Sequence, residues 1–123
     1  MAASAGLLIH PIRDVTIVNF RDPAILDTAQ VEEIGEQLYE LVDGQARRKI
    51  ILDFSKTRSL SSSALSILIA LRSKADEING QVVICGLGKE LKRAFKITNL
   101  HKLFTICKNE EKALAVFGIT TAG

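Results

Sequence analysis

The chain has 123 residues, of which 47% are hydrophobic and 24% are charged. This length and composition are typical of one globular domain, which we expect to span residues 1–123, with an ordered core over about 8–118 and short tails of small residues. Sixteen basic residues against fourteen acidic ones leave a net charge of +2. This charge is too balanced for a protein that coats nucleic acid or anionic lipid.

The cysteines and the start of the chain bear on metals, redox chemistry and location. Cys85 and Cys107 sit in separate apolar runs without CxxC spacing, so we predict neither a metal site nor a cofactor. We interpret both as buried free thiols of a cytoplasmic protein. Residues 1–14 lack the basic stretch of a signal peptide, and no apolar run approaches the ~18 residues of a membrane span. We therefore expect no membrane insertion.

The first strong pattern is a pair of β-branched runs. They cover residues 7–12 and 15–20 and are separated by the polar pair Arg13-Asp14. Short runs of this kind with a polar break predict an antiparallel hairpin. Pro11 indicates that the first strand lies at an edge of the sheet, because proline cannot donate a ladder hydrogen bond.

From residue 27 onward, helical and extended patterns alternate. Apolar residues at helical spacing predict a first helix between a capping Asp27 and a terminating Gly44. Further strands are predicted at 49–55, 81–86 and 103–107, and further helices at 61–79, 88–97 and 109–117. Helical crossovers between strands require a parallel sheet. The sequence therefore predicts an α/β sandwich with about five strands, mostly parallel with an antiparallel N-terminal edge, and about four helices.

The helix predicted over residues 61–79 has two unlike faces. One arc carries apolar residues that should pack on the sheet, namely Ala64, Ile67, Leu68, Leu71, Ala75 and Ile78. The opposite stripe mixes hydroxyls with large aliphatic side chains and consists of Ser62, Leu65, Ser66, Ile69 and Ser73. An exposed helix usually presents charges instead, so this stripe predicts a partner-binding surface. In the alternative interpretation, a neighbouring helix of the same domain covers the two aliphatic residues.

Three consecutive serines, Ser61, Ser62 and Ser63, open this helix. Serine is a preferred N-cap residue, but one cap needs only one serine. The three hydroxyls follow a short loop from a central strand, at the edge where α/β folds usually hold their functional groups. They form the candidate site of the chain.

Two segments resemble the STAS domain, a family that includes sulphate transporter tails and bacterial anti-sigma factor antagonists. Residues 51–71, ILDFSKTRSLSSSALSILIAL, are similar to its apolar strand ending in Asp-Leu and its Asp-Ser-Ser-Gly-Leu helix start. Residues 85–117 are similar to the closing part of the family pattern, through Leu91, Ile97, Asn99, Leu100, Leu103, Phe104 and Ala113. The resemblance covers roughly residues 8–118 and implies the STAS fold.

In anti-sigma factor antagonists, the first serine of that motif accepts phosphate from an anti-sigma factor that is itself a serine kinase. The matching residue here is Ser62, and Ser61 or Ser63 is the less favoured acceptor. The resemblance thus implies a non-catalytic regulatory module whose partner is such a kinase. Two departures are that Ser61 replaces the usual Asp and Ala64 the usual Gly. They keep open an alternative, an unphosphorylated accessory subunit of an ABC-type lipid or anion transporter, or a signalling scaffold.

Other patterns give no separate function. There is no GxSxG motif, and His10 and His101 lie far from the serines in sequence, so we do not expect an enzyme. The Gly-Leu-Gly-Lys segment at 86–89 lacks P-loop spacing and reads as an ordinary turn. The helix at 27–43 is acidic and the helix at 88–97 basic. These are solvated faces, or they orient a partner; a nucleic-acid role is not expected.

Overall fold

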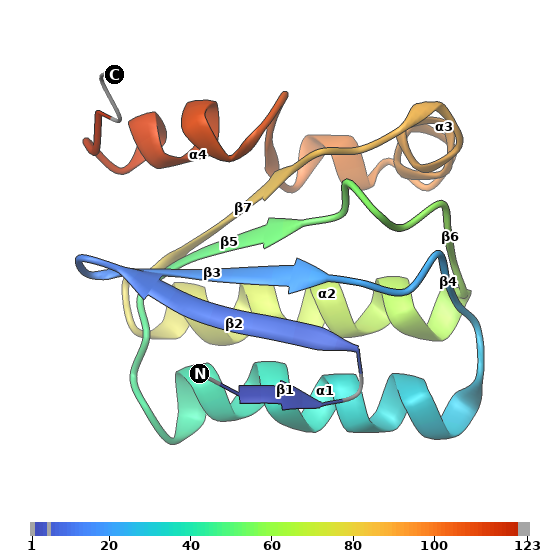
Figure 1. The fold of residues 1–123 in the computed structure, drawn as a ribbon, viewed down its shortest axis with the longest axis horizontal. Coiled ribbons are helices and arrows are strands. Elements are labelled where there is room, and N and C mark those ends of the chain that lie inside the picture. Colours follow the sequence, from blue (N-terminus) through green and yellow to red (C-terminus); the bar gives the residue numbers. More distant parts are fainter. Residues whose placement is uncertain (1, 5, 121–123) are drawn as a thin grey trace.

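The computed structural model describes residues 2–4 by their backbone and residues 6–120 in full. Its main sheet has six strands in the order β1-β2-β3-β5-β7-β8 (Figure 1). They are β1 (Ala2–Ser4), β2 (Leu7–Ile12), β3 (Val15–Phe20), β5 (Lys49–Asp53), β7 (Gln81–Cys85) and β8 (Thr105–Cys107). The pairs β1-β2 and β2-β3 are antiparallel, and the other neighbours are parallel. The predicted mixed sheet with an antiparallel N-terminal edge is confirmed.

Four α-helices connect and cover these strands. They are α1 (Thr28–Asp43), α2 (Ser62–Glu77), α3 (Lys89–Ile97) and α4 (Glu110–Val116), and a 3₁₀ turn spans Leu100–Lys102. The first helix begins where predicted, because the Asp27 side chain accepts a hydrogen bond from the Gln30 amide at 3.1 Å. A short ribbon of β4 (Ala24–Ile25) and β6 (Ser59–Leu60), which the sequence did not predict, joins the loops before α1 and α2.

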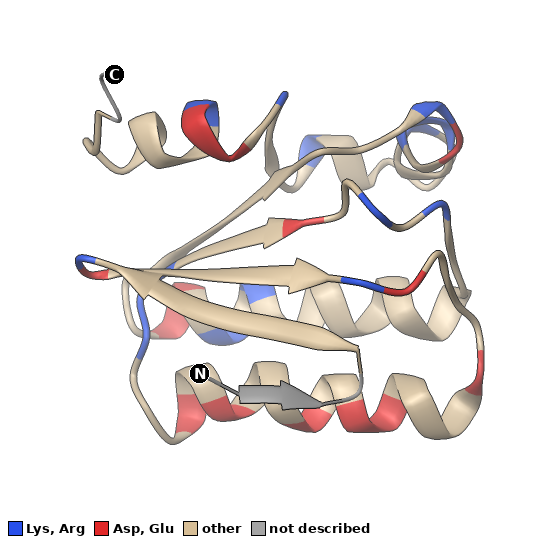
Figure 2. Cartoon of the chain, in the orientation of Figure 1, with Lys and Arg blue, Asp and Glu red and all other residues tan. Residues whose placement is uncertain are grey.

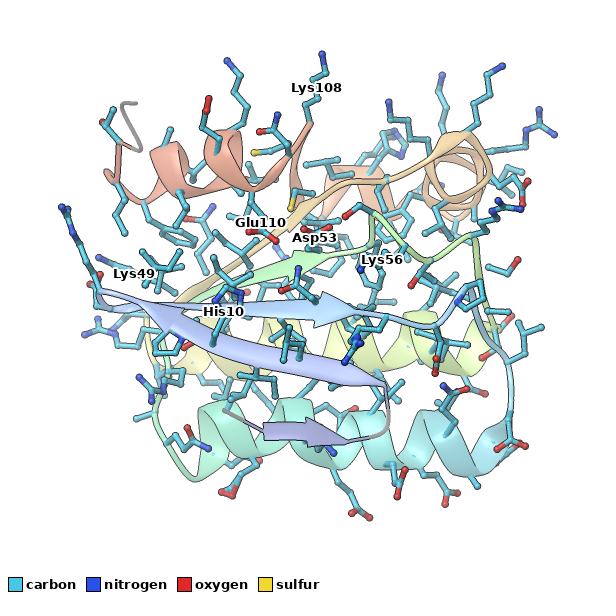
Figure 3. The ribbon with its side chains drawn as sticks, in the orientation of Figure 1. His10, Lys49, Asp53, Lys56, Lys108 and Glu110 are labelled. Carbon is cyan, nitrogen blue, oxygen red and sulfur yellow. The ribbon has the colours of Figure 1, made fainter. Side chains whose placement is uncertain are left out.

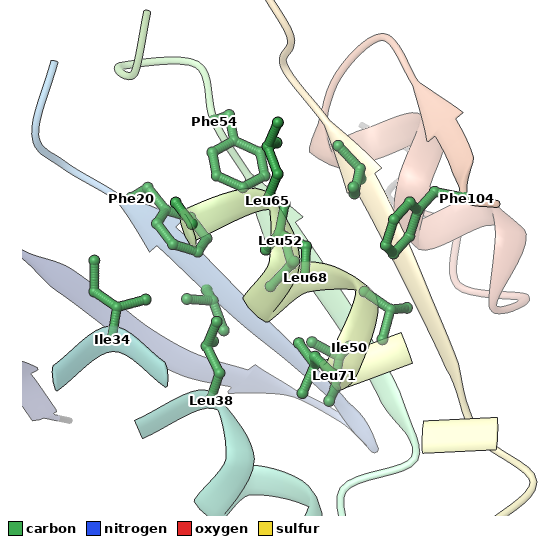
Figure 4. Packing of buried hydrophobic residues seen from close by; sticks show 14 of the residues in the cluster. Phe20, Ile34, Leu38, Ile50, Leu52, Phe54, Leu65, Leu68, Leu71 and Phe104 are labelled. Atoms are coloured by element: carbon green, nitrogen blue, oxygen red, sulfur yellow. The ribbon is translucent and has the colours of Figure 1, made fainter. Parts of the chain in front are cut away.

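The sheet separates two apolar cores. Helices α1 and α2 lie along one face and α4 along the other (Figure 1), and α3 contributes Leu91 and Phe95 to the core of α1 and α2. Figure 4 shows this larger core, in which the rings of Phe20 and Phe54 stack with centroids 4.3 Å apart. The smaller core joins α4 to alternate side chains of the central strands, as expected for strands buried on both faces. Helix α2 thus packs on the sheet and against α1.

The N-terminal edge differs from the prediction. Strand β2 is not the outermost strand over its whole length, because β1 pairs with its residues Leu7 to Ile9. Pro11 lies beyond that pairing and contacts only β3, which accommodates its missing N–H. The small residues of β1 carry no strand pattern in the sequence, yet they pair with β2, so the expected tail at 2–4 is part of the sheet. The expected C-terminal tail falls largely at 121–123, outside the described residues.

Candidate functional site

The start of α2 is fixed by the loop that precedes it. The Ser61 hydroxyl accepts a hydrogen bond from the Ala64 amide at 3.1 Å and so caps the helix. The Ser61 amide in turn donates to the Ile25 carbonyl at 3.0 Å, beside the β4-β6 ribbon. One of the three serines therefore has the structural role expected of an N-cap, and its backbone is held on both sides.

Ser62 and Ser63 are free of that role. Both are exposed and occupy the first two positions of α2. The Ser62 carbonyl accepts a hydrogen bond from the Ser66 hydroxyl at 3.1 Å, whereas the Ser62 hydroxyl has no hydrogen-bond partner among the described residues. The structure therefore leaves this hydroxyl accessible at a helix N-terminus, where several backbone amides lack intrahelical acceptors.

The stripe predicted on α2 is exposed at four of its five positions. Ser62, Ser66 and Ser73 are exposed, and Ile69 retains 38% of its accessible surface. Because these four positions recur at helical spacing, they form one outward stripe, which we call the α2 face. Apart from Ile69, this face is polar and uncharged.

The prediction for Leu65 is wrong. Its side chain is only 8% exposed and belongs to the larger core, where Figure 4 shows it with Phe54 and Leu68. At about 100° per residue, Leu65 lies some 60° from Ser62 toward the buried side of the helix. On the same side of the sheet, β6 contacts both α2 and α3, and the α3 residues Leu91 and Phe95 belong to the same core cluster as Leu65. The alternative interpretation, coverage from within the domain, holds for Leu65 but not for the exposed Ile69.

The opposite flank of α2 packs on α1. Gly35 permits this approach, since a Cβ atom there would lie 3.0 Å from the Ile67 Cδ1 atom. Ile67 and Ile78, expected on the sheet-facing arc, are only partly buried. The two helices are also joined by Lys74 and Asp43, 2.8 Å apart. Contacts with α1 thus hold α2, the helix that carries the candidate site, in place.

Charge is segregated around this helix. Figure 2 shows acidic residues along α1 and basic residues on α3 and on the segment after β5. The exposed carboxylates of α1 are those of Glu32, Glu33, Glu36, Glu40 and Asp43. In Figure 2, α2 therefore lies between an acidic helix and a basic one.

A polar cluster on the other face of the sheet was not predicted. The Asn19 side-chain nitrogen donates to Asp53 Oδ2 at 3.2 Å and to Glu110 Oε2 at 2.7 Å, and the His10 Nε2 atom lies 3.1 Å from the Asn19 oxygen. Figure 3 shows His10, Asp53 and Glu110 approaching this point from β2, β5 and the start of α4. Asp53 Oδ1 also accepts from the Ser55 amide at 2.9 Å. The cluster therefore joins α4 to the loop that leads to α2.

The pKa values of the two carboxyls in this cluster are shifted in opposite directions. Their mutual hydrogen bond, together with burial, raises the pKa of Glu110 above its usual value. Burial alone would raise the pKa of Asp53, but hydrogen bonds from Glu110 and Ser55 outweigh it and lower that pKa. The two shifts have opposite signs, so Asp53 loses its proton at a lower pH than Glu110 does.

The turn after β7 is explained by this cluster. Gly86 has a φ of +75°, and a Cβ atom there would lie 2.7 Å from Asp53 Oδ1. Only glycine combines that backbone angle with so close an approach. Packing and backbone conformation thus explain why Gly86 is glycine, in agreement with the interpretation of the Gly-Leu-Gly-Lys segment as an ordinary turn.

The cysteines are free, as expected, but differ in burial. Cys85 is buried, and burial followed by the nearby carboxylates raises the pKa of its thiol strongly. Cys107 is only partly buried, and desolvation raises its pKa too. In the part of the chain that the structure describes, no group of three or more His, Cys, Asp or Glu residues is placed to hold a metal ion, and no helix is long and apolar enough to cross a membrane.

A cleft of about 610 Å³ lies at the other end of the sheet and is lined by Arg47, Arg48 and Lys49. Helices α1 and α2 both end beside it. Cations near helix C-termini offset the negative end of the helix dipole. Lys49 is further paired with Asp14 at 2.7 Å. These basic residues are accounted for by the fold and do not extend the candidate site.

Comparison with known proteins agrees with this geometry. The model of the STAS domain matches residues 9–113. A Bordetella bronchiseptica protein named as the anti-sigma factor antagonist BtrV is 24% identical over 93 residues, which cover 76% of this chain and 79% of that protein.

Two solved structures show the same fold. An anti-sigma factor antagonist from Mycobacterium paratuberculosis has a TM-score of 0.81 at 21% identity, covering 97% of this chain and 100% of the other. The phosphorylated form of the Bacillus cell fate determinant SpoIIAA has a TM-score of 0.70 at 16% identity, covering 89% and 98%. The family pattern, matched over most of the chain, and the shared fold show that this protein belongs to the STAS domain family.

Proposed function

We propose that this protein is an anti-sigma factor antagonist, which binds an anti-sigma factor with serine kinase activity through the α2 face and is released by phosphorylation of Ser62. The observation that carries the proposal is that the three serines have different structural roles. Ser61 caps α2, while the Ser62 hydroxyl is exposed and has no hydrogen-bond partner among the described residues. A kinase can reach it without unfolding any element.

The names of relatives support the same role. BtrV is named as an anti-sigma factor antagonist, and SpoIIAA, which shares the fold, has been solved in a phosphorylated form. The position that matches the family's phosphoacceptor serine is Ser62. Ser61, where the family usually has Asp, keeps the capping function, because a serine oxygen accepts the same backbone hydrogen bond as a carboxylate.

The energetics favour a switch in binding rather than in folding. A phosphoserine adds a charge of about −1.5 to −2 at neutral pH. At a helix N-terminus that charge gains ~0.3 to 1 kcal/mol, so the fold should tolerate it. Burying the same charge, unpaired, in an interface with the α2 face costs several kcal/mol. Each 1.4 kcal/mol weakens binding about tenfold, so phosphorylation should release the partner.

Ile69 is the apolar anchor that the α2 face offers to a partner. We expect Ile69→Asp to leave the far-UV circular dichroism spectrum unchanged and to weaken binding of the cognate anti-sigma factor kinase by at least about tenfold in titration calorimetry. The matched control is Ile97→Asp, because Ile97 is 74% exposed at the end of α3 and lies outside the α2 face. Equal binding by both variants would place the interface elsewhere.

The departure at Ser61 favours the second candidate, an accessory STAS subunit of a lipid or anion transporter or a scaffold. Without the family's usual carboxylate beside Ser62, the acceptor serine lacks one negative charge for kinase recognition. This candidate requires that the α2 face binds a transporter component or a scaffold. It also requires that no anti-sigma factor kinase incorporates phosphate into the protein.

A further inference from the structure

The carboxyl pair on the second face of the sheet has no part in the proposed switch. Asp53 ends β5 and is 8% exposed, while Glu110 is the first residue of α4. One nitrogen, that of Asn19, donates to both, at 3.2 and 2.7 Å. Its two N–H groups thus bring one oxygen of each carboxyl to the same amide. Two carboxylates this close repel each other unless they share a proton, because a protonated carboxyl can donate a hydrogen bond to its neighbour.

Other groups around the pair do not supply a neutralising ion pair. His10 on β2 lies 3.1 Å from the Asn19 oxygen and acts on Glu110 through charge, and Lys56, in the loop after β5, acts in the same way on Asp53. From β7 and β8 the facing titratable groups are the thiols of Cys85 and Cys107, whose pKa values are raised. Neither carboxyl has a salt-bridge partner among the described residues, so loss of the shared proton leaves two adjacent negative charges.

The pair is placed where it can control the docking of α4. That helix is seven residues long and packs over β5, β7 and β8, chiefly through Ala113 and Leu114. Glu110 joins the first turn of α4 to the sheet, because it accepts a hydrogen bond from Asn19 of β3 at 2.7 Å. A helix this short has little stability of its own and depends on tertiary contacts.

We propose that Asp53 and Glu110 form a proton-sharing clasp that holds α4 on the sheet, and that loss of the shared proton loosens α4 without unfolding the rest of the domain. The proposal is independent of the phosphorylation of Ser62. The sign follows from linkage. A carboxyl with a raised pKa in the folded state binds more protons folded than unfolded, so its stabilising effect is present at low pH and is lost as the pH rises through the raised pKa.

Amide hydrogen exchange measured by NMR tests the clasp. Between about pH 5 and about pH 8.5, after correction for intrinsic exchange rates, protection of the α4 amides should fall, while α2 amides in the same sample keep theirs. Each unit by which the Glu110 pKa exceeds its usual value corresponds to a tenfold loss of α4 protection. Glu110→Gln should remove this pH dependence, because an amide donates to Asp53 at every pH.

Glu111→Gln is the matched control. Glu111 is exposed in the same first turn of α4, so its replacement removes the same charge near the same helix end and should leave the pH dependence of wild type intact. Constant α4 protection in wild type, or an unchanged profile in Glu110→Gln, overturns the clasp. If Glu110→Gln does not fold, carbon-13 titration of the side-chain carboxyls in wild type decides. Glu110 titrating above its ordinary range and Asp53 below supports the clasp, and two ordinary titrations overturn it.

Discussion

Leu65 and Ile69 lie one turn apart on α2, yet truncating them should have very different effects on the free energy of unfolding. Leu65 is 8% exposed and part of the larger core. Leu65→Ala removes three carbon atoms from that core, and at ~0.8 kcal/mol per buried methylene the transfer term alone is about 2.4 kcal/mol. The cavity left behind adds to this, so we expect a loss of about 2.5 to 3.5 kcal/mol.

Ile69→Ala is the companion measurement. Ile69 retains 38% of its accessible surface, and alanine has a higher helix propensity than isoleucine. These two effects limit the expected loss to under about 1 kcal/mol. The assay is equilibrium unfolding in urea, followed by circular dichroism, with the slope against denaturant unchanged in both variants. Equal losses for the two variants, or a loss below about 1 kcal/mol for Leu65→Ala, would refute the assignment of Leu65 to the core.

Three further predictions concern single residues. Gly86→Ala should lower the free energy of unfolding in urea by about 2 to 4 kcal/mol. Gly118→Ala, at a similar φ of +79° but with open space around it, should lower it by only ~1 kcal/mol, and equal losses would exclude the close contact at Gly86. Ser61→Ala should cost about 1 kcal/mol through loss of the α2 cap, as measured in the same way, and a neutral effect would contradict that role. Iodoacetamide in native buffer near pH 8 should alkylate Cys107 before Cys85, because Cys85 is buried and the pKa of its thiol is strongly raised. Mass spectrometry reads the order of alkylation, and the reverse order would be inconsistent with the packing of β7.

Local signals in the sequence were sufficient to predict the helices and the longer strands. Asp27 caps α1 and Gly44 ends it, as their residue types predict. The apolar run before Asp53 is a central strand because it is long enough and uninterrupted. The short β1 and the β4-β6 ribbon escaped prediction because their pairing depends on backbone proximity, and two or three residues carry no periodic pattern.

The candidate site was predicted in part, for a physical reason. The outward direction of Ser62, Ser66 and Ile69 follows from helical geometry alone. Leu65 lies at the boundary of that face, and its burial depends on the other elements of the larger core that it joins. Periodicity within one helix cannot report on a neighbour in space.

The polar cluster on the other face was not predictable from the patterns used. Glu110 follows Asn19 by 91 residues, and in the sequence it belongs to an acidic first turn that is typical of any exposed helix. Asp53 was noticed only as the end of a strand. A charged residue at the end of an otherwise buried strand was the one available signal, because such a group needs a partner.

The central claim is that Ser62 is the acceptor of a phosphate that controls binding. The direct measurement is incubation of the protein with its cognate anti-sigma factor kinase and ATP, followed by mapping of the phosphate by mass spectrometry. We expect one phosphate on Ser62, none in Ser62→Ala, and unchanged modification in Ser73→Ala, which removes an exposed hydroxyl from the same face. Phosphate on Ser61 or Ser63, or no phosphate on wild type, would contradict it.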